Sequence, residues 1–327
     1  MARRIRTELT ERLGVDHPIV QGGMMWVSRP ALVAAVAEAG AFGFLTALTF
    51  GNPEGLAEAI DETRRLTDKP FGVNLTFLPT LVPVDYGPFI DVIVEKGIPA
   101  VETAGRNPEP YIDRIKAGGA IVIHKCTSIR HARKAVAIGC DMISIDGFEC
   151  AGHPGEDDVT SLILIPRAVD ELDVPVIASG GFADGRGLAA ALAMGAVGVN
   201  MGSRFLVTEE APVHENVKRR LVEASETDTL LVMRTLRNTE RVLANEWARK
   251  IVAMEREGAG LEELAPLLSG KNGLRAITEG EVDAGLIAAG QAIGLIHDIP
   301  RVGELVERVV GEAVEIIGSR LPELLTS

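Results

Sequence analysis

Two glycine-bearing segments in the second half of the chain could together bind a phosphate group. The first contains Gly180 and Gly181, and the second contains Gly202 followed by Ser203. Glycine suits such a site because its backbone N–H group can approach phosphate oxygens without a Cβ atom in the way. A helix that begins at such a loop adds a favourable dipole. Gly180, Gly181, Gly202 and Ser203 are therefore the candidate phosphate-binding residues.

Glycine and polar residues also follow several short apolar runs nearer the N-terminus. Gly22 and Gly23 would let a planar ligand approach the backbone, while Asn74 and Thr76 supply an amide and a hydroxyl. Lys125 places a positive charge at the end of an apolar run in an acidic chain. Donors along a pyrimidine edge and positive charge near N1 are what a flavin requires, so these residues predict a flavin site.

His153 is the candidate catalytic residue. It lies between Gly152 and Pro154, in a segment that follows another apolar run. An imidazole in a loop beside a bound ligand can act as a general base or a hydrogen-bond donor near neutral pH. Nearby Cys150 has the chemistry of a nucleophile, but the sequence places no base beside it.

All these residues lie at the ends of short apolar runs that alternate with amphipathic segments. The runs are too short for helices, and most precede Gly, Asn, Thr or Ser, which is typical of buried parallel strands. The predicted strands are Pro18–Gln21, Gly43–Thr46, Phe71–Asn74, Ala100–Thr103, Ala120–His124, Met142–Asp146, Val174–Ser179 and Gly198–Met201. Eight strand–helix repeats predict an α/β fold, the (β/α)8 TIM barrel, whose active residues lie at the carboxyl ends of the strands.

The alternation breaks after the eighth predicted strand. Residues 209–300 are predicted to be mostly helical, with segments at Val213–Ala224, Asn238–Glu257, Gly260–Leu268 and Ala284–Ile296. The apolar stripe of Arg301–Leu324 predicts an amphipathic helix that completes the barrel. We therefore expect a TIM barrel of residues 1–208 and 301–327, with a helical subdomain, residues 209–300, inserted between strand eight and the final helix.

The composition restricts the classes of function. The net charge is −13 without a prominent basic run, so neither nucleic acid nor an anionic membrane is an expected partner. The 3 cysteines show no metal-ligand spacing, and their low, odd number favours a reducing compartment. No segment has the pattern of a signal peptide or a membrane span. We therefore expect a cytoplasmic protein without a metal site. The sequence leaves open whether the protein forms a homodimer.

Motifs spread across nearly the whole chain resemble those of one enzyme family. They are Gln21–Met24, Asn74–Thr76, His124–Cys126, Ala151–His153, Ala178–Gly181 and Asn200–Phe205. Together they look like the nitronate monooxygenase family, formerly called 2-nitropropane dioxygenases. The resemblance implies a TIM barrel with one non-covalently bound FMN. It also implies that Gly181, Gly202 and Ser203 hold the phosphate, that Gly23, Met24, Asn74 and Lys125 line the isoalloxazine, and that His153 faces the substrate.

The resemblance implies an oxidoreductase that oxidises alkyl nitronates with O2, in which His153 takes the α-proton of a neutral nitroalkane. An alternative comes from residues 146–158, which resemble most closely a subgroup regarded as NADH:quinone reductases. The proline-bearing segment Asn74–Pro83 matches that subgroup as well. In this alternative NADH gives hydride to FMN, and a quinone takes the electrons. Flavin-containing enoyl-acyl-carrier-protein reductases share the barrel and a similar Ala-Gly-His loop. The expected substrate is thus a small molecule: a nitronate, a quinone or NADH.

Two hypotheses outside the family also stay open. An IMP-dehydrogenase-like enzyme shares the two phosphate loops and would make Cys150 an essential nucleophile. A non-enzymatic protein that binds a flavin or another phosphate ligand would use the same loops without turnover.

Overall fold

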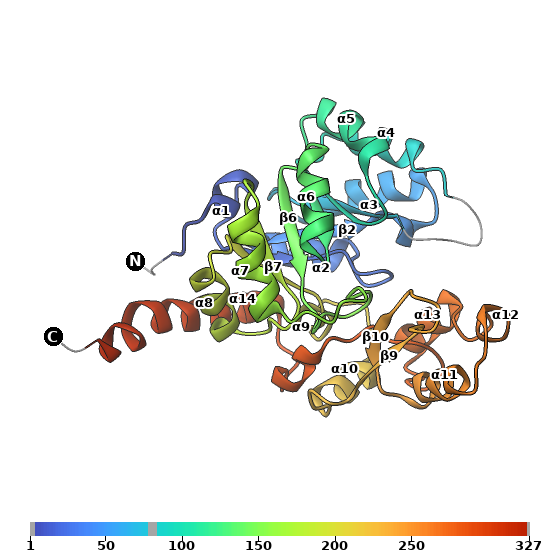
Figure 1. Cartoon of the computed structure of the whole chain (residues 1–327). Coiled ribbons are helices and arrows are strands. Elements are labelled where there is room, and N and C mark those ends of the chain that lie inside the picture. The colour runs from blue at the N-terminus through green and yellow to red at the C-terminus, as the bar shows by residue number, and fades with distance from the viewer. Residues whose placement is uncertain (1–3, 78–83, 326–327) are drawn as a thin grey trace.

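The computed structural model describes residues 4–77 and 84–325 of the chain. Within these residues, eight parallel strands form a closed barrel in sequence order, with β1 pairing both β2 and β8 (Figure 1). The predicted (β/α)8 barrel is therefore confirmed. Its strands are β1 (Ile19–Gln21), β2 (Phe42–Thr46), β3 (Gly72–Phe77), β4 (Ala100–Gly105), β5 (Ile121–Cys126), β6 (Met142–Asp146), β7 (Val176–Ser179) and β8 (Gly198–Met201).

Helices alternate with the strands and surround the barrel. Side-chain caps fix where several of them begin: Asn52 accepts a hydrogen bond from Gly55 N at 2.7 Å, and Asp184 accepts one from Gly187 N at 3.1 Å. The surrounding helices are α2 (Pro30–Glu38), α3 (Pro53–Leu66), α4 (Gly87–Glu95), α5 (Glu109–Ala117), α6 (Ile129–Ala137), α7 (Ser161–Glu171), α8 (Gly185–Ala193) and α14 (Val302–Glu315).

The amino-terminal end of the barrel is filled with apolar side chains. Leu9 and Leu13 of α1 (Glu8–Leu13) pack with Phe42, Phe44 and Ile177 from the strands in one buried cluster. The T-shaped contact of Phe42 with Phe44, at 5.1 Å between ring centroids, occupies part of this interior. Because this end is closed, a ligand can enter the barrel only from the carboxyl ends of the strands.

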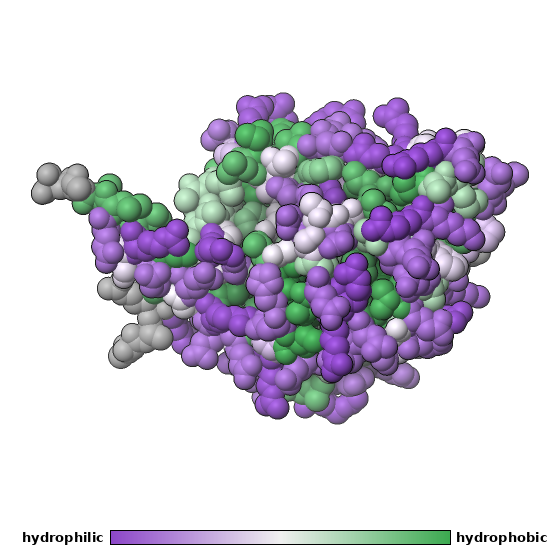
Figure 2. All heavy atoms as spheres, turned by 90° about the horizontal axis from the view of Figure 1, so that it is seen from below, coloured by the Kyte–Doolittle hydropathy of each residue, from purple (hydrophilic) through white to green (hydrophobic). Residues whose placement is uncertain are grey.

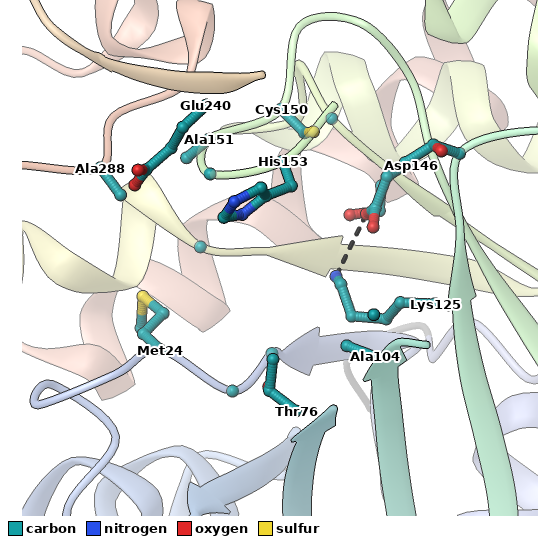
Figure 3. A pocket seen from close by; sticks show the side chains of 18 of the residues that line it. Met24, Thr76, Ala104, Lys125, Asp146, Cys150, Ala151, His153, Glu240 and Ala288 are labelled. Atoms are coloured by element: carbon teal, nitrogen blue, oxygen red, sulfur yellow. Dashed lines mark ion pairs between the residues drawn. The ribbon is translucent and has the colours of Figure 1, made fainter. Parts of the chain in front are cut away.

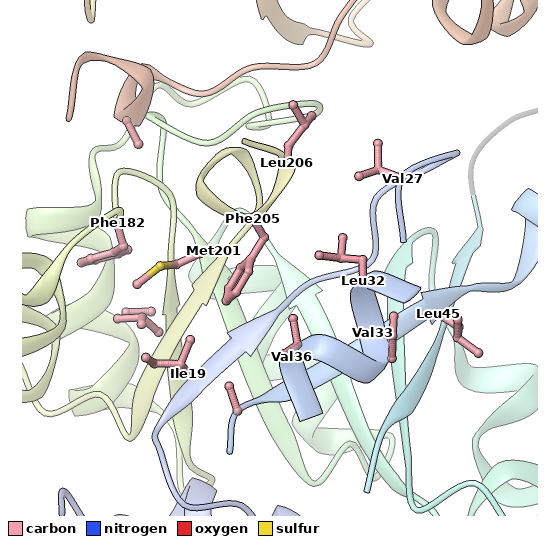
Figure 4. Packing of buried hydrophobic residues seen from close by; sticks show 14 of the residues in the cluster. Ile19, Val27, Leu32, Val33, Val36, Leu45, Phe182, Met201, Phe205 and Leu206 are labelled. Carbon is pink, nitrogen blue, oxygen red and sulfur yellow. The ribbon is translucent and has the colours of Figure 1, made fainter. Parts of the chain in front are cut away.

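A second layer of apolar residues joins the outside of the strands to the helices. Ile19 and Met201 pack there with Val33 of α2 and with Phe205, all buried (Figure 4). Phe205 belongs to α9 (Ser203–Leu206), a single turn that follows β8 directly. This packing holds the loop after β8 rigidly against the barrel.

The final helix α14 fits between α8 and α2 and thereby closes the ring of helices. The Glu312 carboxylate accepts a hydrogen bond from Gly185 N at the start of α8, at 2.7 Å. The regular helix ends at Glu315, and the chain continues as a π turn and a short 3-10 turn to Leu324. This end of the chain projects from the barrel and exposes Leu324 and Leu325 (Figures 1 and 2).

The insertion between β8 and α14 contains helices and a small sheet. Its helices are α10 (Glu215–Val222), α11 (Glu246–Arg256), α12 (Leu261–Leu264) and α13 (Gly270–Glu279), and its antiparallel strands are β9 (Thr229–Val232) and β10 (Glu240–Leu243). Val232, Val242, Ile251 and Leu264 form a hydrophobic core of their own. We call β9, β10, α11 and α12 the distal lobe. In contrast, α10 contributes Val217 and Leu221 to the main core beside the barrel helices.

Two predictions for the insertion are wrong in detail. The helix predicted at Asn238–Glu257 begins only at Glu246, because residues 240–243 form a strand that pairs with β9. Asn245 then caps α11 by accepting a hydrogen bond from Ala248 N at 2.8 Å. The helix predicted at Ala284–Ile296 is reduced to a 3-10 turn, Gln291–Leu295, because Ala288 bridges to Val242 of β10.

The predicted proline-bearing loop, Asn74–Pro83, lies outside the described residues from position 78 onward. In the described parts of the chain, no helix has the length and apolar character needed to cross a membrane.

Candidate functional site

A cavity of about 1310 Å³ lies at the carboxyl end of the barrel, where the insertion covers the strand ends (Figure 3). Loops after most of the barrel strands line it, as do Thr239 and Glu240 of the insertion. The structure brings all the predicted site residues to this one cavity: Gly23, Met24, Asn74, Lys125, His153, Gly180, Gly181, Gly202 and Ser203.

The glycines after β7 have a conformation that other residues rarely adopt. Gly180 has a φ of +90° and Gly181 a φ of +88°. A Cβ atom on Gly180 would lie 2.8 Å from the carbonyl oxygen of Gly147. Gly202 differs, because a Cβ there would meet only Met24 Sδ, at 3.8 Å. The space beside Gly202 is therefore open to a ligand.

Ser203 connects the barrel to the insertion. Its hydroxyl accepts a hydrogen bond from Gly290 N at 3.0 Å, and the Ser203 side chain is buried. Close by, Gln291 N donates to the carbonyl of Glu149 at 2.9 Å. The segment from 290 to 291 therefore links the loop after β6 to the loop after β8.

A fully buried carboxylate, Glu102 of β4, organises the floor of the cavity. It accepts hydrogen bonds from Gly23 N at 3.0 Å, from Asn74 Nδ2 at 2.7 Å and from Asn200 Nδ2 at 3.0 Å. The other end of the Asn74 amide accepts from Thr76 Oγ1 at 2.9 Å. Asn74 therefore lines the cavity in one fixed orientation, with most of its hydrogen-bonding capacity already used inside the protein.

Lys125 forms an ion pair with Asp146 at the end of β6, with 3.1 Å between Nζ and Oδ1 (Figure 3). Burial by itself would lower the pKa of Lys125, but the carboxylates of Asp146 and Glu102 outweigh that effect and raise it. The lysine is therefore charged at neutral pH. The positive charge of Lys125 is therefore one half of an ion pair, in which Asp146 neutralises much of it.

His153 is held over the cavity by a backbone bridge to the insertion. Arg241 N donates to Gly152 O at 2.6 Å, and Gly152 N donates to Arg241 O at 3.1 Å. The Arg241 side chain points the other way, where Nη2 donates to Phe148 O at 2.9 Å. Burial lowers the pKa of His153, and Glu156 only partly offsets this, so the imidazole is neutral at pH 7.

Two further groups that line the cavity are also uncharged near neutral pH. Burial lowers the pKa of His124 to about 4, and its Nδ1 lies 2.8 Å from Thr103 Oγ1. Burial raises the pKa of Cys150 strongly, and Asp146 adds to this effect. A thiol that stays protonated is a weak nucleophile, which disfavours the hypothesis of an IMP-dehydrogenase-like enzyme.

Two acidic residues of this site, Glu102 and Glu240, are not among the residues predicted from the sequence. The sequence does contain an indication for Glu102, because it is a charged residue within an apolar strand. A carboxylate buried in this way needs hydrogen-bond donors around it. The sequence contains no such indication for Glu240, because its segment has the pattern of a helix. The structure places the Glu240 carboxyl in the cavity beside His153 (Figure 3).

The cavity mouth carries exposed basic side chains. Arg106 follows β4, and Arg130 and Lys134 lie on α6; all three line the cavity. Lys134 has a distant ion pair with Glu109, at 3.8 Å. Within the described residues, neither Arg106 nor Arg130 forms a salt bridge. In a protein with a net charge of −13, this mouth is a local site for an anionic group.

Comparison with known proteins gives a match over nearly the whole chain. The model of the nitronate monooxygenase family matches residues 6–312. Two curated relatives also align with most of this chain. A "(3aS,4S,5R,7aS)-5-hydroxy-7a-methyl-1-oxo-octahydro-1H-indene-4-carboxyl-CoA dehydrogenase" from Rhodococcus jostii is 35% identical and covers 96% of this chain and 97% of its own. A "Probable nitronate monooxygenase" from Staphylococcus saprophyticus is 32% identical, with coverage of 76% and 81%.

Solved structures agree with these matches. FabK from Thermotoga maritima superposes with a TM-score of 0.90 at 37% identity, over 98% of this chain and all of that one (100%). A nitroalkane oxidase from Streptomyces ansochromogenes superposes with a TM-score of 0.79 at 27% identity, over 95% and 99% of the two chains. Among these relatives and structures, the printed names include a carboxyl-CoA dehydrogenase, a probable nitronate monooxygenase and a nitroalkane oxidase.

Proposed function

Because the chain belongs to the nitronate monooxygenase family and is an oxidoreductase, we propose that it uses FMN as its resident cofactor. The observation that carries this proposal is the cavity at the barrel mouth, where open glycine loops, fixed amide groups and a paired lysine meet. Each part of FMN has residues of suitable chemistry there.

The phosphate of FMN would lie at the loops after β7 and β8. Gly180 and Gly181 present backbone without side chains, and the space beside Gly202 is free of protein atoms out to Met24. Ser203 adds a backbone N–H group to this set. Glycine N–H groups of this kind are suitable donors to a phosphate, so the residues present fit the group.

The isoalloxazine would lie across Gly23 and Met24, with Asn74 and Lys125 at its polar edge. When bound, FMN would supply the capacity to accept and return electrons. The chain itself contributes fixed groups: Glu102 orients the floor, and the lysine–aspartate pair supplies a charged donor whose position does not depend on pH near 7. His153, which is neutral, can donate one hydrogen bond or accept one proton from a substrate.

The second substrate is expected to be large and anionic. The cavity of about 1310 Å³ exceeds the ~300–1,000 Å³ that is typical of a pocket for one ligand. Its mouth carries Arg106, Arg130 and Lys134, which suit phosphate groups. A coenzyme A thioester has this size and charge. The dehydrogenase relative, named for a carboxyl-CoA substrate and matched over 97% of its length, supports this class.

Nitronate oxidation is the second candidate activity. The family model and the relative from Staphylococcus support it, as does a neutral histidine suited to an acidic α-proton. NADH:quinone reduction is a third candidate, because the basic mouth and the spare volume would also accommodate NADH. All three activities require the same flavin site, so one experiment can separate them.

The test is an anaerobic flavin assay on the purified, flavin-loaded protein. The flavin is mixed separately with NADH, NADPH, propionate 3-nitronate and a saturated acyl-CoA, and its bleaching is followed by absorbance. We expect bleaching by a pyridine nucleotide or by the acyl-CoA, with reoxidation by an enoyl-CoA. Bleaching by nitronate alone would identify a monooxygenase. Bleaching by NADH with reoxidation only by benzoquinone would identify the reductase.

An Arg106→Ala, Arg130→Ala double variant tests the substrate class. Removal of each guanidinium should raise KM for an acyl-CoA about tenfold while kcat stays similar, because the cations bind the distant end of the substrate. KM for the corresponding acyl-pantetheine, which lacks the nucleotide, should not change. Exposed Arg167→Ala on α7 is the matched control. A protein that is colourless and binds no FMN would overturn the whole proposal.

A further inference from the structure

The hairpin strand β10 brings a second protein group to the position of His153. Gly152 and Arg241 form an antiparallel bridge with both backbone hydrogen bonds made. His153 and Glu240 are the next residues of the two segments beyond this bridge, and both line the cavity. Both side chains enter the cavity from its roof (Figure 3).

A neighbouring contact fixes the register of this pair. The Glu156 carboxylate accepts hydrogen bonds from Thr239 N at 2.9 Å and from Thr239 Oγ1 at 2.6 Å. The loop after β6 and the start of β10 are therefore joined on both sides of Glu240. A slip of one residue would break these bonds and turn Glu240 away from the cavity.

We infer that Glu240 is a catalytic residue of this enzyme, the group that exchanges the α-proton of a carbon-acid substrate beside His153. The inference rests on the proposed function, since thioesters and nitroalkanes are both carbon acids. In one direction a carboxylate oxygen of Glu240 forms an O–H bond as the α C–H bond breaks. The electron pair stays on the substrate and delocalises into the thioester carbonyl or the nitro group. The reverse step returns the proton to carbon.

The surroundings of Glu240 suit this role. Burial alone raises the pKa of Glu240 to about 7, so both protonation forms are populated near neutral pH, as an efficient proton-transfer group requires. The charged or titratable residues His153, Glu156 and Arg237 line the same cavity, and burial is the one cause of the raised pKa of Glu240. Neutral His153 can donate a hydrogen bond to the substrate oxygen on which negative charge develops.

The inference is tested by deuterium incorporation, which needs no net turnover. Flavin-loaded protein is incubated in D2O with butyryl-CoA, or with nitroethane, in the absence of any electron donor or acceptor. Mass spectrometry then measures deuterium at the α-carbon. We expect exchange with the wild type, at a rate that rises with pH around a midpoint near 7. In Glu240→Gln we expect the exchange rate to fall about 10²–10⁴-fold and to show no such midpoint.

Three variants make the result decisive. Glu240→Asp should retain measurable exchange with the midpoint, and exposed Glu262→Gln, on the same lobe, should match the wild type. His153→Gln should slow exchange but keep the midpoint. Flavin content and circular dichroism of each variant report folding. Exchange in Glu240→Gln at the wild-type rate, or no exchange with either probe in the wild type, would overturn the inference. The anaerobic bleaching assay separately decides whether the proposed function stands.

Discussion

At the scale of single residues, buried polar groups position the site. Glu102 has no exposed surface and satisfies three donors from three different segments. Lys125 and Asp146 neutralise each other near the same floor. Hydrogen bonds to a charged group are worth more than neutral ones, and an unpaired partner is costly when buried. The floor of the cavity is therefore rigid before any ligand binds.

We predict that Glu102→Gln weakens both the protein and its flavin site. The amide presents a donor where Asn200 Nδ2 already donates, so at least one hydrogen bond is broken. The free energy of unfolding should fall by about 1–3 kcal/mol. Urea denaturation and FMN titration by fluorescence quenching measure the two effects. Exposed Glu58→Gln is the control. Unchanged stability and FMN affinity in Glu102→Gln would contradict this role.

The buried imidazole of His124 predicts a pH dependence of stability. Its pKa falls on folding from 6.5 to about 4 because burial disfavours the charged form. Between these values the unfolded chain binds a proton that the folded chain does not. Stability is therefore lost as the pH falls through this window, by roughly 3 kcal/mol at 1.36 kcal/mol per pKa unit. The free energy of unfolding is measured by urea denaturation at pH 7 and at pH 4.5. Its loss between the two pH values should be smaller in His124→Gln than in the wild type. The exposed control His131→Gln should behave as the wild type does.

At the scale of elements, the strand–helix repeats of the barrel could be predicted from the sequence. Strands whose conformation depends on partners distant in the chain could not. The barrel strands are short apolar runs with helices between them, so their pattern is visible in the chain. β10 is different, since Glu240–Leu243 is as compatible with the start of a helix as with a strand. Its strand conformation comes from pairing with β9, Gly152 and Ala288. The role of Glu240 could not be predicted before that pairing was known.

The contact between α8 and α14 gives a prediction about two glycines. A Cβ on Gly185 would lie 2.5 Å from Val309 O and from Glu312 Cβ, so Gly185→Ala should cost about 1–3 kcal/mol of stability. Gly311 lies on the exposed side of α14 with no atom near its missing Cβ. Gly311→Ala should therefore stabilise the protein by about 0.5–1 kcal/mol. Thermal melting compares them; a stabilising Gly185→Ala would show that the helices can separate freely.

At the scale of the whole molecule, the cavity lies between the barrel and an insertion that has a hydrophobic cluster of its own. The barrel helices and α10 share one hydrophobic cluster with Leu243 of β10, whereas the other buried apolar residues of the distal lobe form a cluster around Ile251. Polar links between the insertion and the barrel loops include the Gly152–Arg241 bridge and the hydrogen bonds Thr239–Glu156, Arg241–Phe148, Gly290–Ser203 and Gln291–Glu149. Apart from Leu243, the lobe keeps its buried apolar residues in its own cluster, so we expect the lobe to unfold while the barrel stays folded.

Ile251→Ala tests this separation. Ile251 is fully buried in the core of the distal lobe, so its truncation should cost about 2–5 kcal/mol. That destabilisation should fall on the lobe alone, and hydrogen exchange should accelerate in α11, β9 and β10 while β3 to β5 keep their protection. The roof over the cavity would then open, and FMN should dissociate at a lower temperature than the barrel unfolds. Ile115→Ala on α5, equally buried but in the main core, should instead lower the unfolding temperature of the barrel itself. Uniform acceleration of exchange across both bodies in Ile251→Ala would mean that lobe and barrel fold as one cooperative unit, because the polar links would then be transmitting the destabilisation.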